Sequence, residues 1–316
     1  MLKGISYISN IDGDRDSFNI IVLIIGVNMT KAVFDLLRIL RCIFKEDYNE
    51  IFDNILGKDY NIVSTDIFSA FGFILGDGII IPRNRYCYIE IKSTLVHTIV
   101  AGIMHLKAIS DERYLYINCS GSGHSIMNYH LRFKTYDKNI KIVREVKRNK
   151  TSLEQKWITP SFLAGYFDAD GSVSTNTKTM QHKIVFVSKN PVLLMQISRS
   201  VGDKFGINMS SKPTRIRPYI FRDKHGNIFH KRTTYQIYTT NEESTLKFID
   251  LILPHVAHIA RKLKIILIKQ YYSGDISKNE FNFLIRMVRK LNTFLHASCF
   301  TKIGCLTFLR ELIQYF

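Results

Sequence analysis

The sequence predicts a mixed fold of helices and antiparallel strands, arranged as two similar units in tandem. Three observations predict it. A short motif of apolar residues, an acid and a glycine occurs twice, at 71–81 and 164–174. Each copy is followed by the same order of strand, helix and hairpin patterns. The chain has 316 residues, 46% of them hydrophobic, which suffices for two compact units with further segments at both ends.

The two motifs read FGFILGDGIII and AGYFDADGSVS, and their acids, Asp77 and Asp170, lie 93 residues apart (170 − 77 = 93). Each motif is an apolar helix pattern that passes through the acid and a glycine into a β-prone run. Side chains that can cap a helix N-terminus precede both patterns, at 64–66 and at Thr159. The glycine after each acid occupies a position where a helix end commonly requires a positive φ.

The patterns that follow the motifs also correspond. In the first copy YCYIEIKS alternates as a strand, TLVHTIVAGIMHLK has helical spacing, and RYLYINCS with NYHLRFKTY predicts a hairpin. In the second copy these are HKIVFVSK, NPVLLMQISRSVGDKFG, and a hairpin of TRIRPYIF with TTYQIYTT. Helices are then expected at about 242–253, 257–272 and 278–295.

These patterns divide the chain into four parts. We expect an N-terminal extension of unknown role at 1–62 and a first repeat at 63–150, which ends in a basic linker. The second repeat is expected at 151–272, and a C-terminal helical segment at 273–316.

The composition indicates a polyanionic partner. The net charge is +17 with a pI of about 9.6, and a globular chain this basic typically binds nucleic acid. A basic protein without such a partner is the alternative. Five cysteines without CxxC spacing argue against a structural zinc site and favour a reducing compartment. The apolar run FNIIVLIIGVNM is too short to cross a bilayer, so no membrane partner is expected.

Small residues four apart recur at the same place in both motifs, Gly72 with Gly76 and Gly165 with Ala169. Residues four apart share one face of a helix, and without large side chains two backbones can approach closely. The repeated spacing therefore predicts that the two motif helices cross side by side about a pseudo-two-fold axis.

This crossing would bring Asp77 and Asp170 together at two helix C-termini, which already carry negative partial charge. Divalent cations would resolve the repulsion, so the sequence predicts a hard-metal site of carboxylate, backbone carbonyl and water oxygen. Asp168 points elsewhere on the helix and is replaced by Leu75 in the first motif, so we expect it to serve packing or solvation.

At this point the residues resemble a known family. LAGYFDADG at 163–171 differs from the LAGLIDADG signature only at Tyr166 and Phe167, and AFGFILGDG at 70–78 is a looser copy. The chain resembles two-motif, single-chain LAGLIDADG homing endonucleases of the kind encoded in organellar introns, over about residues 63–272. The resemblance implies an α+β fold of two tandem αββαββα repeats related by a pseudo-two-fold, with antiparallel sheets that form a DNA-binding saddle.

The resemblance also implies site residues. The family's catalytic acids match Asp77 and Asp170, and its metal-holding carbonyls match Gly76 and Ala169. Mg²⁺ or another hard divalent cation would be the cofactor. Basic residues near the attacking water match Lys92 and Lys189 at the ends of the second strands, although two surface lysines are the alternative. A further family lysine is assigned to Lys262, with Arg261 and Lys264 as competing candidates.

The binding surface is predicted on the strands, because Arg and Lys suit phosphates and guanine edges. In TRIRPYIF, alternation places Arg215, Arg217, Tyr219 and Phe221 on one face. A merely solvated sheet face is the alternative. The remaining residues that we expect to bind DNA are Lys224, Lys231 and Arg232 in the second repeat, and Arg83, Arg85, His130, Arg132 and Lys134 in the first.

The functional prediction is a site-specific homing endonuclease that hydrolyses both strands of double-stranded DNA with a divalent metal and so spreads its host intron. The alternatives are an RNA-binding maturase that assists group I intron splicing, alone or in addition, and a DNA-binding regulator without cleavage. Because both motifs lie in one chain, we expect a monomer and a long asymmetric DNA site. The abundance of Ile, Lys, Asn, Tyr and Phe is typical of an AT-rich genome and favours an organelle, the mitochondrion before the chloroplast.

Overall fold

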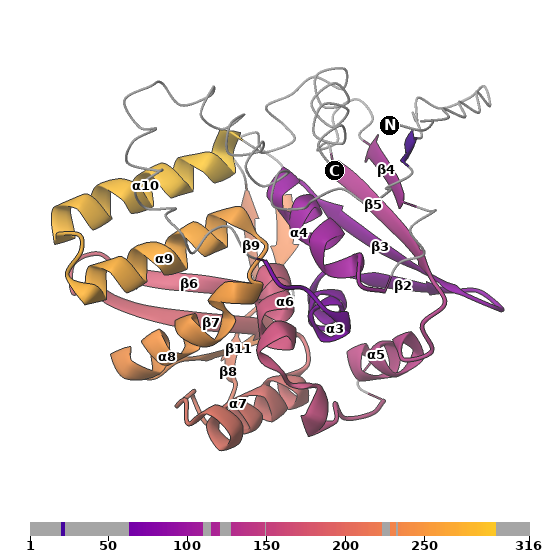
Figure 1. Ribbon diagram of the computed structural model, residues 1–316, viewed down its shortest axis with the longest axis horizontal. Coiled ribbons are helices and arrows are strands. Elements are labelled where there is room, and N and C mark those ends of the chain that lie inside the picture. The colour runs from indigo at the N-terminus through magenta and orange to yellow at the C-terminus, as the bar shows by residue number, and fades with distance from the viewer. Residues whose placement is uncertain are drawn as a thin grey trace.

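Two helices form the centre of the molecule, α3 (Ile67–Gly76) and α6 (Pro160–Asp170). The computed structural model describes residues 20–22, 63–109, 115–120, 128–148, 150–222, 228–231 and 233–294. Both helices begin where the sequence predicts. Asp66 caps α3 through a reciprocal pair of hydrogen bonds with Ser69. Thr159 caps α6, because its side chain accepts a hydrogen bond from the Phe162 amide, and Pro160 is the first residue of that helix. In Figure 1 the helices lie side by side, with one sheet on each side.

The crossing of α3 and α6 confirms the small-residue prediction. A Cβ atom added to Gly72 would lie 2.1 Å from the Phe162 carbonyl oxygen. A Cβ atom added to Gly165 would lie 2.0 Å from the Ser69 carbonyl oxygen. These two contacts exchange under the 93-residue offset of the motifs, as a pseudo-two-fold axis requires. The backbones meet at a distance that any side chain at either glycine would prevent.

The first sheet has five strands in the order β1-β4-β5-β3-β2, and every pair in it is antiparallel. Buried Ile89 and Ile91 on β3 and Leu131 and Phe133 on β5 pack toward the core, because alternate residues of a strand share a face. The strands are β1 (Ile20–Val22), β2 (Ile79–Pro82), β3 (Cys87–Ser93), β4 (Leu115–Ser120) and β5 (Asn128–Thr135).

The second sheet has four strands in the order β6-β7-β11-β8, with antiparallel pairing throughout. Ile184, Phe186 and Ile237 form its core face. The strands are β6 (Gly171–Asn176), β7 (Gln181–Ser188), β8 (Thr214–Ile216) and β11 (Thr234–Tyr238). A separate two-stranded ribbon is made of β9 (Tyr219–Arg222) and β10 (Ile228–Lys231).

The remaining helices bury apolar stripes against these sheets and against the central pair. They are α4 (Val96–Leu106), α5 (Ile140–Lys147), α7 (Pro191–Phe205), α8 (Glu242–Ile252), α9 (Ile259–Ser273) and α10 (Lys278–Phe294), with 3-10 turns at Gln155–Trp157 and Leu253–His255. The three helices expected after the second hairpin are therefore present. Of the helices in the described ranges, none is long and apolar enough to cross a membrane.

The chain therefore has an α+β fold of helices and antiparallel sheets, as predicted. The basic segment between the motifs contributes α5, which completes the αββαββα order of the first repeat. The expected division at 62, 150 and 272 stays a prediction.

One local expectation is wrong. Gly171 has φ −83° rather than a positive φ, and Gly78 is likewise not among the positive-φ glycines of the described chain, which are Gly206 and Gly274. The reason is that α6 runs directly into the extended strand β6. Gly171 is needed for space instead, since a Cβ atom there would lie 2.3 Å from Phe167 Cδ2.

Candidate active site

The two acids shared by the motifs, Asp77 and Asp170, meet at the adjacent C-terminal ends of α3 and α6. Asp77 is the C-cap of α3, and Asp170 is the last residue of α6. A Cβ atom on Gly76 would lie 3.4 Å from Asp170 Cβ, so the helix ends are in contact. Both acids line one pocket of about 390 Å³, which Lys147, Ser188 and Lys189 also line. The structure thus brings together the acids that the sequence predicts to act as a pair.

The environment of this pocket favours the protonated form of Asp77. Burial, and then the proximity of Asp170, raise the pKa of Asp77 to about 7, although Arg261 and Lys147 act in the opposite direction. Burial lowers the pKa of Lys147 to about 8 against the attraction of Asp170 and Asp77. At neutral pH the Asp77 carboxyl group is therefore partly protonated, and a further cation bound beside it would favour the ionised form.

The negative helix ends are stabilised by two cationic side chains that the sequence analysis did not place there. Lys147 Nζ donates to the carbonyl oxygens of Gly76 (2.7 Å) and Ile74 (2.8 Å) at the end of α3. Arg261 donates to the carbonyl oxygens of Phe167 (2.8 Å), Asp168 and Ala169 (2.9 Å) at the end of α6. Each central helix thus ends on a cation, which offsets its negative partial charge.

The basic segment between the two motifs carries the sequence pattern that predicts the helix ending at Lys147. Ile140, Val143 and Val146 are spaced as one helical face and are buried, and Lys147 follows them in the last turn of α5. This spacing predicts a helix packed on the core, but the order of elements alone does not say that its C-terminus reaches the acids.

Arg261 takes the place that the sequence analysis gave to Lys262. Lys262 is 1% exposed and its side chain is part of the buried face of α9. The residue before it lies on the neighbouring face, about 100° away, and faces α6. The rotation of α9 about its own axis determines which of its side chains contacts α6. Arg261, one of the competing candidates, is the residue that does so.

The two lysines predicted at strand ends are not equivalent. In the first sheet Ile79 pairs with Glu90, and in the second Ser172 pairs with Val185, so Lys92 corresponds to Val187. Lys189 lines the pocket of the acids. Lys92 instead forms an ion pair with Glu90 (3.6 Å) on the outer face of the first sheet and is 48% exposed. The expected symmetry fails because Lys92 lies one residue before the last residue of β3, Ser93, whereas Lys189 lies one residue after the last residue of β7, Ser188.

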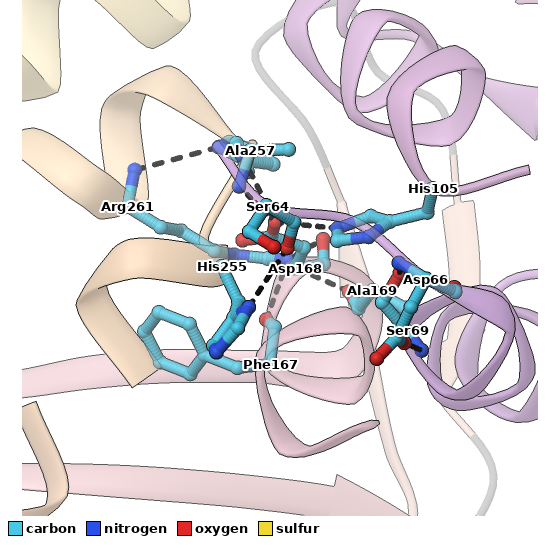
Figure 2. Close-up of polar contacts among 11 residues, drawn as sticks. Ser64, Asp66, Ser69, His105, Phe167, Asp168, Ala169, His255, Ala257 and Arg261 are labelled. Atoms are coloured by element: carbon cyan, nitrogen blue, oxygen red, sulfur yellow. Dashed lines mark hydrogen bonds and ion pairs between the residues drawn. The ribbon is translucent and has the colours of Figure 1, made fainter. Parts of the chain in front are cut away.

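Asp168 belongs to a buried polar network rather than to the pocket (Figure 2). Its Oδ2 atom accepts hydrogen bonds from the amides of Ala257 (2.6 Å) and His258 (3.0 Å) and lies 2.8 Å from His105 Nε2. Asp168 and His105 are both fully buried. This carboxylate therefore joins α4 of the first repeat to the turn before α9, which agrees with the expected packing role.

The predicted DNA-contacting side chains of the first sheet share one face. His130, Arg132 and Lys134 on β5 pair across β3 with Lys92, Glu90 and Tyr88 in that order. All six lie on the face opposite the buried apolar residues of these strands, because side chains alternate, although Glu90 is itself buried.

Several side chains on this face are held by contacts within it. Arg132 Nη2 donates to Glu90 (2.8 Å) and its guanidinium lies over the Tyr88 ring, while Lys134 Nζ lies 4.5 Å from the centre of the Tyr86 ring. Arg83 and Arg85 are exposed at the β2–β3 turn, as predicted.

The predicted strand over 214–221 is interrupted, although its first part, β8, pairs antiparallel with β11 as the predicted hairpin requires. Arg217 and Pro218 separate β8 from β9, because proline has no amide to donate to a ladder. Arg215 pairs with Tyr235 and so shares the face of Ile237, whereas exposed Tyr219 starts the separate ribbon. Phe221 belongs to the same ribbon, in which Lys231 pairs with Tyr219. Lys224 and Arg232, which the sequence also predicts to bind DNA, lie outside the described residues.

The outer face of the second sheet carries residues that the sequence analysis missed. Lys183, Gln236 and Tyr238 lie opposite the buried Ile184, Phe186 and Ile237. Lys183 Nζ lies 4.6 Å from the centre of the Tyr238 ring. Alternation in QHKIVFVS is the signal for Lys183, since its neighbours His182 and Ile184 are buried.

Part of the chain is similar to a known family and to a curated protein. Residues 159–253 match the family described as LAGLIDADG-like domain. The intron-encoded DNA endonuclease ai2b of Dictyostelium discoideum is 27% identical over 143 residues, which is 42% of this chain. The match covers 48% of that relative, so the chain aligns with about half of its length.

Two solved structures are also similar. The homing endonuclease I-WcaI, bound to its DNA recognition sequence, is 16% identical, with a TM-score of 0.42 over 75% of this chain and 98% of that one. The LAGLIDADG homing endonuclease I-GzeII, in complex with a DNA target, is 12% identical, with a TM-score of 0.38 over 72% and 98%. The similarity of this chain to the LAGLIDADG-like domain family extends over residues 159–253.

Proposed function

We propose that this chain is a site-specific DNA endonuclease that uses a divalent metal and hydrolyses both strands of its target near the pseudo-two-fold axis. The observation that carries the proposal is the meeting of Asp77 and Asp170 in one pocket at the ends of two crossed helices. One acid comes from each repeat, so each half of the molecule would contribute an acid to the hydrolysis of one strand of the duplex.

The donor set of the pocket suits a hard cation. Asp77 and Asp170 supply carboxylate oxygens, and burial followed by the proximity of Asp170 raises the pKa of Asp77 to about 7, so a bound cation would favour its ionised form. Among the described residues, no three His, Cys, Asp or Glu side chains gather where they could hold a metal. The Gly76 carbonyl, the phosphate of a bound DNA strand and water would complete the shell. A bound Mg²⁺ would supply Lewis-acid activation of that phosphate.

The protein's own residues would position and stabilise the reacting phosphate. Lys189 lines the pocket and could donate to a phosphate oxygen as negative charge develops there. Arg261 fixes the last turn of α6, and hence the carboxylate of Asp170, through its three carbonyl contacts.

Double-stranded DNA is the proposed substrate because the outer sheet faces carry basic and aromatic side chains in rows. His130, Arg132, Lys134 and Lys183 lie on these faces, and the chain has a net charge of +17. The relative with the matching region is named as an intron-encoded DNA endonuclease. From the name of this relative and the abundance of Ile, Lys, Asn, Tyr and Phe, we also propose that the chain spreads its host intron in an organelle, with the mitochondrion favoured.

We further propose that one chain binds one duplex. Each central helix already has its partner within the chain, and the second repeat contains the β9–β10 ribbon, an addition to its four-stranded sheet. Unequal halves should read unequal half-sites, so an asymmetric target is expected.

The test is incubation of the full chain with a duplex that spans the intron-free insertion site, with Mg²⁺ and with a chelator. Double-strand cleavage at one position only when Mg²⁺ is present is the expected result. Binding to folded intron RNA, with no cleavage of any duplex under these conditions, would favour the maturase alternative instead.

A further inference from the structure

The Gly76 carbonyl, which the family resemblance assigns to a metal, already has a cation bound to it. Lys147 Nζ donates to this oxygen at 2.7 Å and to the Ile74 carbonyl oxygen at 2.8 Å. The same ammonium lies within electrostatic reach of Asp77 and Asp170, and Lys147 lines their pocket. A divalent cation bound by the two acids and the Gly76 carbonyl would have to share this small volume with a positive charge.

We propose that Lys147 is a built-in placeholder cation, which holds the Gly76 carbonyl and balances the acids until a divalent cation displaces its ammonium group. This inference rests on the proposed function, since it assumes that the acids bind a metal. It adds a residue from α5 to the site and predicts an antagonism between that residue and the metal.

The geometry makes Lys147 the exchangeable cation of the two. Arg261 is anchored by three carbonyl contacts through two guanidinium nitrogens. Lys147 holds its two carbonyls through a single nitrogen at the end of a flexible four-carbon stem. That stem starts in the last turn of α5, where rotation of its torsions can move the ammonium away without moving the helix. The end of α3 is therefore open to exchange, and the end of α6 is not.

A purely structural role makes a different prediction. A lysine that only caps the last carbonyls of α3 would stabilise the fold and leave the metal affinity unchanged. A placeholder competes with the metal, so its removal must tighten metal binding. The decisive quantity is therefore the dissociation constant for a divalent ion, measured separately from cleavage.

We would titrate Mn²⁺ alone into the full chain without DNA and follow free Mn²⁺ by electron paramagnetic resonance. Lys147→Met should bind Mn²⁺ about tenfold more tightly than the wild type, because a like charge and a charge-assisted hydrogen bond no longer oppose it. Asp77→Asn should weaken binding in both backgrounds. If Lys147→Met does not fold, Lys147→Gln keeps a donor for the carbonyls and should shift the affinity in the same direction.

Two matched variants distinguish competition between Lys147 and Mn²⁺ from a non-specific effect of removing one positive charge. Lys189→Met removes a positive charge from the same pocket but leaves the Lys147 hydrogen bonds to Gly76 and Ile74 in place, so it should tighten binding by less than about threefold. Lys150→Met removes an exposed lysine that pairs with Glu145 and should change nothing.

An unchanged or weaker affinity in Lys147→Met, an equal gain in Lys189→Met, or no Mn²⁺ binding by any variant would overturn the proposal. Cleavage by the wild-type chain is scored in a separate assay. Loss of the antagonism with cleavage intact would thus remove only the placeholder role and leave the proposed function standing.

Discussion

Gly165 of α6 lies directly against Ser69 of α3, so that a Cβ atom on the glycine would sit 2.0 Å from the serine carbonyl oxygen. The same relationship holds between Gly72 and Phe162 at 2.1 Å. Because both obstacles are backbone atoms, neither contact can be relieved by moving a side chain. The position of both acids depends on this approach.

Replacing Gly165 by alanine should therefore destabilise the chain, by about 3 kcal/mol or more, since the helices must separate. Denaturant unfolding measures the change. Gly202→Ala in α7 is the matched control: its nearest neighbour would be 3.9 Å away, and alanine there should stabilise by up to about 1 kcal/mol. Equal effects of the two substitutions would contradict the close crossing.

The raised pKa of Asp77 predicts a pH-dependent loss of stability. Its folded value of about 7 exceeds the ordinary 3.8, so the folded state binds the proton more tightly. Between pH 4 and 7 the stabilisation from this proton is lost as pH rises, by at most about 4 kcal/mol. The Asp77→Asn side chain does not titrate, so the wild-type free energy of unfolding minus that of the variant should fall across this range.

Buried histidines act in the opposite direction, which is why the difference between the two proteins is needed. Burial lowers the pKa of His97 to about 3 and that of His182 to about 4, so both make the fold less stable in acid. They contribute equally to wild type and variant. A difference that stays flat from pH 4 to 7, in the absence of metal, would show that Asp77 is not held in this environment.

Asp168 should matter for stability. Asp168→Ala leaves the buried amides of Ala257 and His258 and the ring of His105 without their acceptor, which should cost about 3 kcal/mol or more. Asp250→Ala breaks an exposed ion pair with Lys269 and should cost less than about 1 kcal/mol. Thermal unfolding of both variants provides the comparison, and similar small losses would mean that the network contributes little.

The outer sheet faces should carry the salt-dependent part of DNA binding. Replacing Lys134 and Lys183 together by alanine should weaken binding and reduce the slope of log affinity against log salt by about two units. Lys247→Ala is the control, because this lysine pairs with Glu243 on the exposed side of α8. The readout is fluorescence anisotropy at several salt concentrations. A slope unchanged in the double variant would place the DNA on another surface.

The sequence predicted what depends on local pattern and on repetition. The helix caps at Asp66 and Thr159, the close crossing and the pairing of Asp77 with Asp170 follow from motifs that occur twice. Contacts between elements far apart in the sequence could not be predicted from local patterns or from repetition. Arg261 rather than Lys262 reaches α6 because of how α9 is rotated, and Lys147 reaches α3 because of where α5 ends. Strand registers likewise separated Lys92 from Lys189.

The most direct test of the account compares cleavage and binding in Asp77→Asn and Asp170→Asn. Both are assayed on the same duplex with Mg²⁺, and binding is measured with Ca²⁺ in its place. We predict that double-strand cleavage falls below detection in each variant while DNA affinity stays within about tenfold of wild type, because chemistry and phosphate contacts are separate contributions. Cleavage at the wild-type rate by either variant would contradict the assignment of these two acids as the catalytic pair.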